Sequence, residues 1–204
     1  MKPSFWGLRP LHAMLLGCAG LMATTAWGIE PEQVPVTKRS TSGLHLTAEE
    51  AAELKRRGGD GVLFIDIRTR AELTFVGVPS SIDYQVPFLE FPEIWQWSDD
   101  KAEFIQMSNP HFVQDIEQRL ALRGLDKSSA VVLICRSGVR SNSASGLLAL
   151  HGFQQAYTVI DGFEGDTARE GKQRGQRVVN GWKNAGLPWS YKLDKSKVYL
   201  DDPL

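Results

Sequence analysis

Three short, mostly apolar runs, separated by stretches with a helical pattern, constrain the fold of this chain more than any other feature. They lie at residues 62–65, 131–134 and 156–160. Apolar runs of this length are typical of strands buried on both faces of a sheet. Strands that alternate with helices pair in parallel and are joined by right-handed crossovers. We therefore predict one α/β domain over residues 45–192, with a central, mostly parallel sheet flanked by helices.

End signals predict where two of the helices begin and end. Thr47 is followed three residues later by a glutamate, which is a capping-box pattern, and a pair of glycines stops that segment. The second helix is predicted to be capped by Ser108 or Asn109. Pro110 takes its first position and Gly124 ends it.

Two further segments have weaker patterns. Residues 89–107 contain two tryptophans and no clean period, and we interpret them as an irregular insertion that its aromatic side chains partly pack. Near the C-terminus, a short helix is expected around residues 178–184, before Gly186 and Pro188 stop it.

The N-terminal segment, residues 1–28, is predicted to be a cleaved secretory signal peptide. Two basic residues precede an apolar run that is shorter than the about 20 residues needed to cross a bilayer, and small residues follow it. The alternatives are an uncleaved anchor or a buried helix. A faint resemblance to a lipoprotein cleavage box ends at Cys18, but the apolar stretch before it is too short to favour lipid attachment. We expect a periplasmic or secreted mature chain that leaves the membrane, with a lead-in at 29–44 and a tail at 193–204.

Removal of the signal peptide leaves Cys135 as the one cysteine of the mature chain. In an oxidising compartment, a thiol that cannot form an internal disulfide is either reactive or intermolecular. A small, buried, inert cysteine is the alternative. The net charge of −1 gives no general electrostatic reason to bind nucleic acid or an anionic membrane, so any anion binding must be local.

The residues around this cysteine, CRSGVRS at 135–141, combine a thiol with positive charge. A loop that leaves a strand and enters a helix has amide N–H groups that no helical carbonyl satisfies, and the helix dipole also attracts negative charge. Gly138 permits tight curvature, and Arg136 and Arg140 add two guanidinium groups. These effects favour the thiolate over the neutral thiol. The loop therefore predicts a nucleophile and an anion site at one point.

This loop resembles the active-site loop of the rhodanese family of sulfurtransferases. The resemblance extends to VLFIDIRTRAEL, which contains the Asp-x-Arg signature of the family, to VIDGF and to GWKNAGLPW, so it covers about residues 45–190. It implies a rhodanese-like three-layer α/β fold. It also implies a cysteine that takes sulfur from a donor, holds it as a persulfide and passes it to a nucleophilic acceptor, with no metal or organic cofactor.

Residue by residue, the resemblance implies that Cys135 accepts the sulfur. The side chains of Arg136 and Arg140 would bind a small anionic donor such as thiosulfate, and the later acceptor would be a thiol, a protein or cyanide. Asp66 and Arg68 are expected to form a structural ion pair that braces the neighbouring loop. The substrate-binding loop residues, and the supporting residue that follows them, are Arg136, Ser137, Gly138, Val139, Arg140 and Ser141.

Other function classes remain open. The C-x4-R spacing is tighter than the C-x5-R of protein tyrosine phosphatases, which favours one sulfur atom over a phosphoryl group. A sulfur carrier or binding module without turnover, a cysteine-dependent phosphatase and an arsenate-type reductase are the alternatives. After the Asp-x-Arg signature the family commonly has Gly-His-Ile and Gly-Ala, of which this chain keeps only Gly77 and the spacing. The insertion at 89–124 is also long. Both departures leave the donor and the acceptor unassigned. No two histidines have the spacing of zinc ligands.

Overall fold

The structure, a computed structural model, describes residues 28–200. The predicted signal peptide and Cys18 therefore lie outside the described residues, except for Gly28. Between residues 28 and 200, no helix has the length and apolar character that a membrane span requires.

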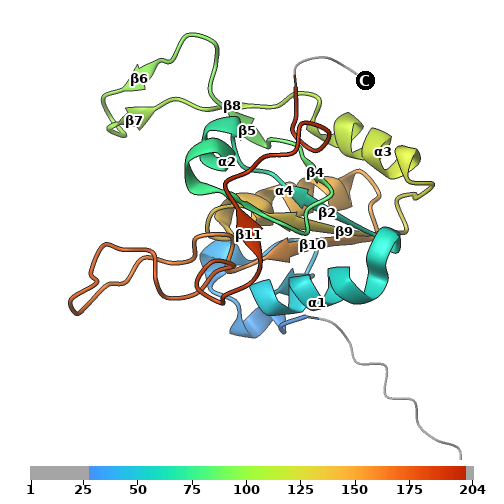
Figure 1. The fold of residues 1–204 in the computed structure, drawn as a ribbon, viewed down its shortest axis with the longest axis horizontal. Coiled ribbons are helices and arrows are strands. Elements are labelled where there is room, and N and C mark those ends of the chain that lie inside the picture. The colour runs from blue at the N-terminus through green and yellow to red at the C-terminus, as the bar shows by residue number, and fades with distance from the viewer. Residues whose placement is uncertain (1–27, 201–204) are drawn as a thin grey trace, which may run out of the picture.

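A five-stranded sheet forms the centre of the molecule (Figure 1), in the order β1-β10-β9-β2-β4. All four pairs of neighbouring strands are parallel. The predicted α/β class with a central parallel sheet is confirmed. Its strands are β1 (His45–Leu46), β2 (Val62–Asp66), β4 (Tyr84–Gln85), β9 (Ala130–Ile134) and β10 (Gln155–Val159).

Helices cover both faces of this sheet because successive side chains of the central strands point to opposite sides. Phe64 and Val132 belong to the core cluster under α1 and α2, whereas Leu63 and Val131 belong to the cluster under α3 and α4. The result is the expected three layers. The helices are α1 (Ala48–Gly58), α2 (Arg70–Val76), α3 (Phe112–Leu122) and α4 (Val139–Leu150), and the short 3-10 turns are Pro31–Gln33, Val36–Lys38 and Gly59–Gly61.

Capping boxes begin α1 and α2. The Thr47 hydroxyl accepts the amide N–H of Glu50, whose carboxylate in turn accepts the Thr47 N–H, as the sequence predicted. Thr69 and Glu72 make the same reciprocal pair at α2, a helix that the sequence reading missed. The signal was present, since a threonine stands three residues before a glutamate there as well.

The predicted beginning of α3 is wrong. The helix begins at Phe112, with His111 as its N-cap, and not at Pro110. Asn109 accepts the His111 N–H on its side-chain oxygen at 2.9 Å, so it closes a local turn before the helix instead of capping it. Beyond the helix, Gly124 takes a positive φ of 66°, in line with its predicted role as the stop.

The helix expected around residues 178–184 is also wrong, because turns occupy this segment. The amide N–H groups of Trp182 and Lys183 donate to the carbonyls of Gly162 and Phe163, in the loop after β10. Those donors are therefore committed to another segment of the chain. Trp182 itself is buried, and its indole N–H donates to the Pro188 carbonyl.

Residues 89–108 form an arm that projects from the body (Figure 1). Where the sequence predicted an irregular insertion, the arm contains two short antiparallel strand pairs, one of which lies within the other in sequence. Its rings do pack on each other, since Phe91 stacks on Trp95 at 4.2 Å and Phe104 meets Trp97 edge to face at 5.3 Å. In the arm, β5 (Leu89–Glu90) pairs with β8 (Met107–Ser108), and β6 (Trp97–Ser98) pairs with β7 (Glu103–Phe104). Outside the arm, a further antiparallel pair joins β3 (Val78–Pro79) to β11 (Trp189–Ser190).

A buried ion pair lies at the carboxyl end of β2. The side chains of Asp66 and Arg68 are fully buried, with an N···O distance of 2.6 Å. Arg68 also donates to the Gly77 carbonyl at 2.8 Å and lies 4.1 Å from the centre of the Phe163 ring. The pair thus joins β2, the end of α2 and the loop after β10, which is the bracing arrangement that the sequence predicted.

We expect Arg68→Met to destabilise the fold by about 3–5 kcal/mol, because the Asp66 carboxylate would stay buried without its partner. The free energy of unfolding, measured in urea, tests this. Arg56→Met is the matched control, since Arg56 makes an exposed ion pair with Glu53 on α1 and should matter little. Equal losses in the two variants would contradict the structural role of the buried pair.

Candidate active site

Cys135 is the first residue after β9, and its loop runs directly into α4. Gly138 is the N-cap of α4 and has a positive φ of 90°. A Cβ atom at this position would lie 2.1 Å from the carbonyl oxygen of Ile160. Glycine is therefore required here both for the backbone conformation and for the close approach of the neighbouring loop.

Hydrogen-bond donors converge on the Cys135 sulfur. The amide of Gly138 lies 3.1 Å from Sγ and the amide of Ser141 lies 3.4 Å from it, both in donating geometry. The Ser141 hydroxyl oxygen, 3.5 Å from Sγ, is an acceptor for the thiol hydrogen. The thiol is only 1% exposed. The nitrogen atoms belong to the first turn of α4, where no helical carbonyl accepts their hydrogens, so they favour negative charge on the sulfur.

A buried hydroxyl relay supports this arrangement. Thr158 in β10 donates to the Ser141 hydroxyl oxygen at 2.7 Å, and that hydroxyl lies 3.2 Å from the Gly138 carbonyl. Both side chains are fully buried. Sequence reasoning named Ser141 as a supporting residue but missed Thr158, which meets the loop only through the pairing of β9 with β10.

Arg140 does not lie free in the pocket. Its guanidinium makes two hydrogen bonds to the Glu72 carboxylate, at 2.8 and 2.5 Å. Burial alone would raise the pKa of Glu72, but the hydrogen bonds and the charge of Arg140 outweigh burial and lower it to about 2. Arg140 is therefore neutralised by a carboxylate, and its predicted contact with a donor stays a prediction.

Two other guanidinium groups face the site. Arg136 is exposed, Arg177 is half-buried, and both line the pocket that contains Cys135. Among residues 28–200, neither forms an ion pair with a carboxylate. The sequence predicts Arg136 at this site because it directly follows Cys135. It does not predict Arg177, because no local pattern connects Arg177 with the cysteine loop.

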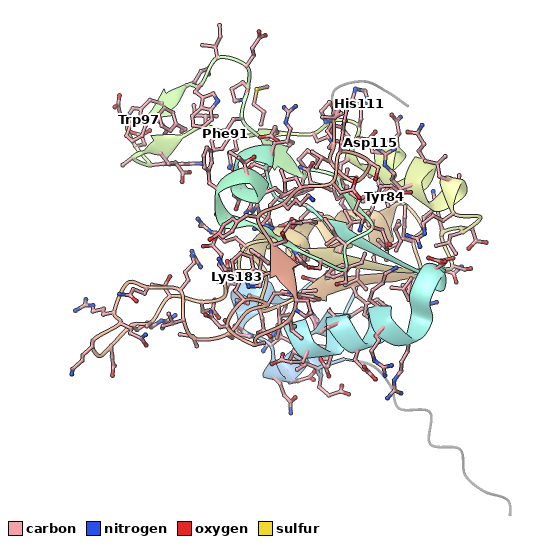
Figure 2. The ribbon with its side chains drawn as sticks, in the orientation of Figure 1. Tyr84, Phe91, Trp97, His111, Asp115 and Lys183 are labelled. Atoms are coloured by element: carbon pink, nitrogen blue, oxygen red, sulfur yellow. The ribbon has the colours of Figure 1, made fainter. Side chains whose placement is uncertain are left out.

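The pocket has a volume of about 1080 Å³. It lies between the active-site loop, α2 and the arm, whose residues Phe91 and Trp97 are seen in Figure 2. Its lining combines apolar, cationic and acidic side chains, the acidic ones being Glu72 and Glu103. The apolar residues are Phe75, Val76, Leu89, Phe91, Phe104, Ile105 and Val139, and the cationic ones are Lys101, Arg136, Arg140 and Arg177.

Within the described part of the chain, no cluster of three or more histidine, cysteine, aspartate or glutamate side chains could hold a metal ion. The pocket offers a nearly enclosed sulfur, its amide donors and several guanidinium groups.

Comparisons with known proteins agree with this geometry. The family model described as "Rhodanese-like domain" matches residues 47–168. An uncharacterized protein of Rickettsia conorii is 30% identical over 135 residues, which are 65% of this chain and 85% of that protein. A related protein of Rickettsia prowazekii is 27% identical over the same shares of the two chains.

Solved structures share the fold. The crystal structure of Rv0390 from M. tuberculosis matches with a TM-score of 0.51 and 30% identity, covering 72% of this chain and 97% of that one. The polysulfide-sulfur transferase homodimer from Wolinella succinogenes matches with a TM-score of 0.45 and 21% identity, covering 78% and 85%. The second likeness is too distant to support an argument.

We expect Glu72→Gln to lower the free energy of unfolding near neutral pH but to change it little in acid. The pKa of Glu72 is about 2 in the folded chain and about 4.3 when unfolded, so its contribution is present above pH 4.3 and is lost as the pH falls towards 2. The full contribution is on the order of 3 kcal/mol. Unfolding in urea should show a gap between wild type and variant that narrows from pH 5 to pH 2.5. The exposed Glu93→Gln is the control, and a gap independent of pH would refute the assignment.

Proposed function

The chain belongs to the rhodanese-like domain family, and on that premise we propose that it is a sulfurtransferase that carries sulfur on Cys135. In the first half-reaction, the thiolate attacks the outer sulfur of thiosulfate. The sulfur–sulfur bond of thiosulfate breaks, and sulfite leaves with the bonding electron pair. Cys135 then carries a persulfide.

In the second half-reaction, a nucleophile attacks the terminal sulfur of the persulfide. The bond between the two sulfur atoms breaks, and its electron pair returns to Cys135 as the thiolate. Cyanide would leave as thiocyanate, and a thiol would become a persulfide itself. The cycle consumes no external oxidant or reductant.

The convergence of donors on the sulfur is the observation that carries this proposal. The Gly138 and Ser141 amides donate to an atom that is negative as a thiolate, as an attacking group and as a leaving group. Fixed dipoles in a buried place stabilise such charge without reorganisation. The two amides would stabilise the same charge when it develops on the sulfur during attack and departure.

The pocket supports a further proposal about the acceptor. A volume of about 1080 Å³ is that of a site for a drug-sized ligand and is far larger than cyanide requires. The Phe75 side chain, 79% exposed, is one of the apolar residues that line this pocket. We therefore favour an acceptor with an apolar body and a thiol, either a small molecule or a protein segment, in a mature chain that acts outside the cytoplasm.

A sulfur carrier without turnover is the second candidate. It would form the same persulfide but would hold it until a particular protein partner arrived. The exposed rings of the arm favour this variant, since Trp95 and Trp97 are each about half exposed, at 51% and 52%, and such residues are enriched in protein interfaces. Release of sulfur to small acceptors separates the two candidates.

Incubation with thiosulfate is expected to add one sulfur atom to the protein, and cyanide is expected to remove it. Intact mass measures the gain, and peptide mapping should place it on Cys135 and not on Cys18. Cys135→Ser is the control and should gain nothing. An unchanged mass in the wild-type protein would end the sulfurtransferase proposal, whereas a persulfide that cyanide and small thiols leave intact would favour the carrier.

Phe75→Ala is expected to lower kcat/KM for an aryl thiol acceptor several-fold, because the lost ring contact is worth about 1 kcal/mol. The same variant should leave the rate with cyanide unchanged, since cyanide is too small to reach both the ring and the sulfur. Leu150→Ala, an exposed apolar residue at the end of α4 that does not line the pocket, is the control. Equal effects on both acceptors would show that Phe75 does not contact the acceptor.

A further inference from the structure

Arg177 lines the pocket of Cys135 from a part of the chain that the family model does not match. That model ends at residue 168, whereas Arg177 lies in the loop at 164–180, which projects from the same side of the molecule as the arm (Figure 1). Arg177 lines one pocket with Cys135 and Arg136.

The guanidinium of Arg177 is tied to the active-site loop through one glycine. Its Nη1 donates to the Gly165 carbonyl at 2.6 Å, and the Gly165 N–H donates to the Arg136 carbonyl at 3.2 Å. Gly165 has a positive φ of 85°, and a Cβ atom there would lie 1.7 Å from the Asn180 carbonyl oxygen. Only glycine can make this connection.

The backbone of Arg177 is fixed as well. Arg177 forms an antiparallel bridge with Thr167, and its carbonyl accepts the Asn184 amide at 3.2 Å. At the base of the loop, the buried Lys38 pairs with Asp166 at 2.7 Å. Several hydrogen bonds and an ion pair therefore hold this loop, and with it the Arg177 guanidinium, in place.

The local charge balance leaves Arg136 and Arg177 without close counter-charges. Burial, followed by the charge of Arg136, lowers the pKa of Arg177, although Glu164 and Asp166 act in the opposite direction. Among the described residues, no carboxylate lies within ion-pair distance of either guanidinium, whereas Arg140 has Glu72. Two like charges held in one pocket repel each other, and an anion with two charges relieves that repulsion better than an anion with one.

We propose that Arg136 and Arg177 form a two-guanidinium clamp that selects doubly charged sulfur donors over singly charged ones at Cys135. This inference rests on the proposed sulfurtransferase function and names its donor class. Thiosulfate carries two charges, and the sulfite that leaves it keeps both. The clamp therefore holds the donor both before and during cleavage of the sulfur–sulfur bond, so it acts on kcat/KM.

The test compares two donors with the same reacting bond, thiosulfate with two charges and methanethiosulfonate with one. Arg177→Gln is expected to lower kcat/KM for persulfide formation from thiosulfate by about tenfold or more, the range for loss of a charged hydrogen bond. The rate with methanethiosulfonate should fall by less than about threefold, as expected for a change in net charge alone. Arg177→Lys should restore part of the selectivity for thiosulfate.

Arg174→Gln is the matched control, because Arg174 is exposed on the same loop and does not line the pocket. All measurements are made at one ionic strength. If Arg177→Gln slows both donors equally, or if Arg174→Gln loses the same selectivity, the clamp is overturned.

A binding measurement separates failure of the clamp from failure of the proposed function. Sulfate, which donates no sulfur, is expected to slow alkylation of Cys135 by iodoacetamide, as followed by peptide mapping. The concentration for half protection should rise about tenfold in Arg177→Gln. Methanesulfonate should protect weakly in both proteins. Protection by sulfate without any persulfide from thiosulfate would keep the clamp and reject the sulfurtransferase, whereas equal protection of both proteins would reject the clamp.

Discussion

The active site depends on the direct contact between two backbone loops, one after β9 and one after β10. The Cys135 carbonyl accepts the Phe163 N–H at 2.8 Å, and the Arg136 carbonyl accepts the N–H groups of the residues that follow. Gly162 makes this possible, since a Cβ atom there would lie 2.4 Å from the Ser137 nitrogen. The carbonyls of the cysteine loop are thereby turned away, and its amides are left to face the sulfur.

The arginines around this contact fall into two groups, those that pair with a carboxylate and those that do not. Arg68 and Arg140 each lie against a carboxylate, so their charges hold β2, α2 and α4 together. Arg136 and Arg177 form no such ion pair within the described residues, and both line the pocket. A buried guanidinium that is paired with a carboxylate has a structural role. A guanidinium in the pocket that has no such partner can bind an anion.

The sequence predicted what depends on local patterns. Strand β9 and the place of Cys135 followed from an apolar run, and the cap of α1 followed from Thr47 and the glutamate after it. Residues that meet only through the fold could not be predicted: Thr158 contacts the Ser141 hydroxyl through strand pairing, and Arg177 joins the pocket lining through the Gly165 contact. The expected helix at 178–184 failed for the same reason, because distant carbonyls take its amide hydrogens.

The enclosure of the sulfur limits the order of events in the proposed reaction. Cys135 is 1% exposed, and the pocket that it lines is shared by residues of the arm and by Arg136 and Arg177. A donor held by the guanidinium groups occupies the approach that an acceptor must use, since both must reach the same atom along the line of the breaking bond. In the proposed reaction, donor and acceptor therefore bind one after the other, and the sulfur rests on Cys135 between them. This order is that of a covalent double displacement.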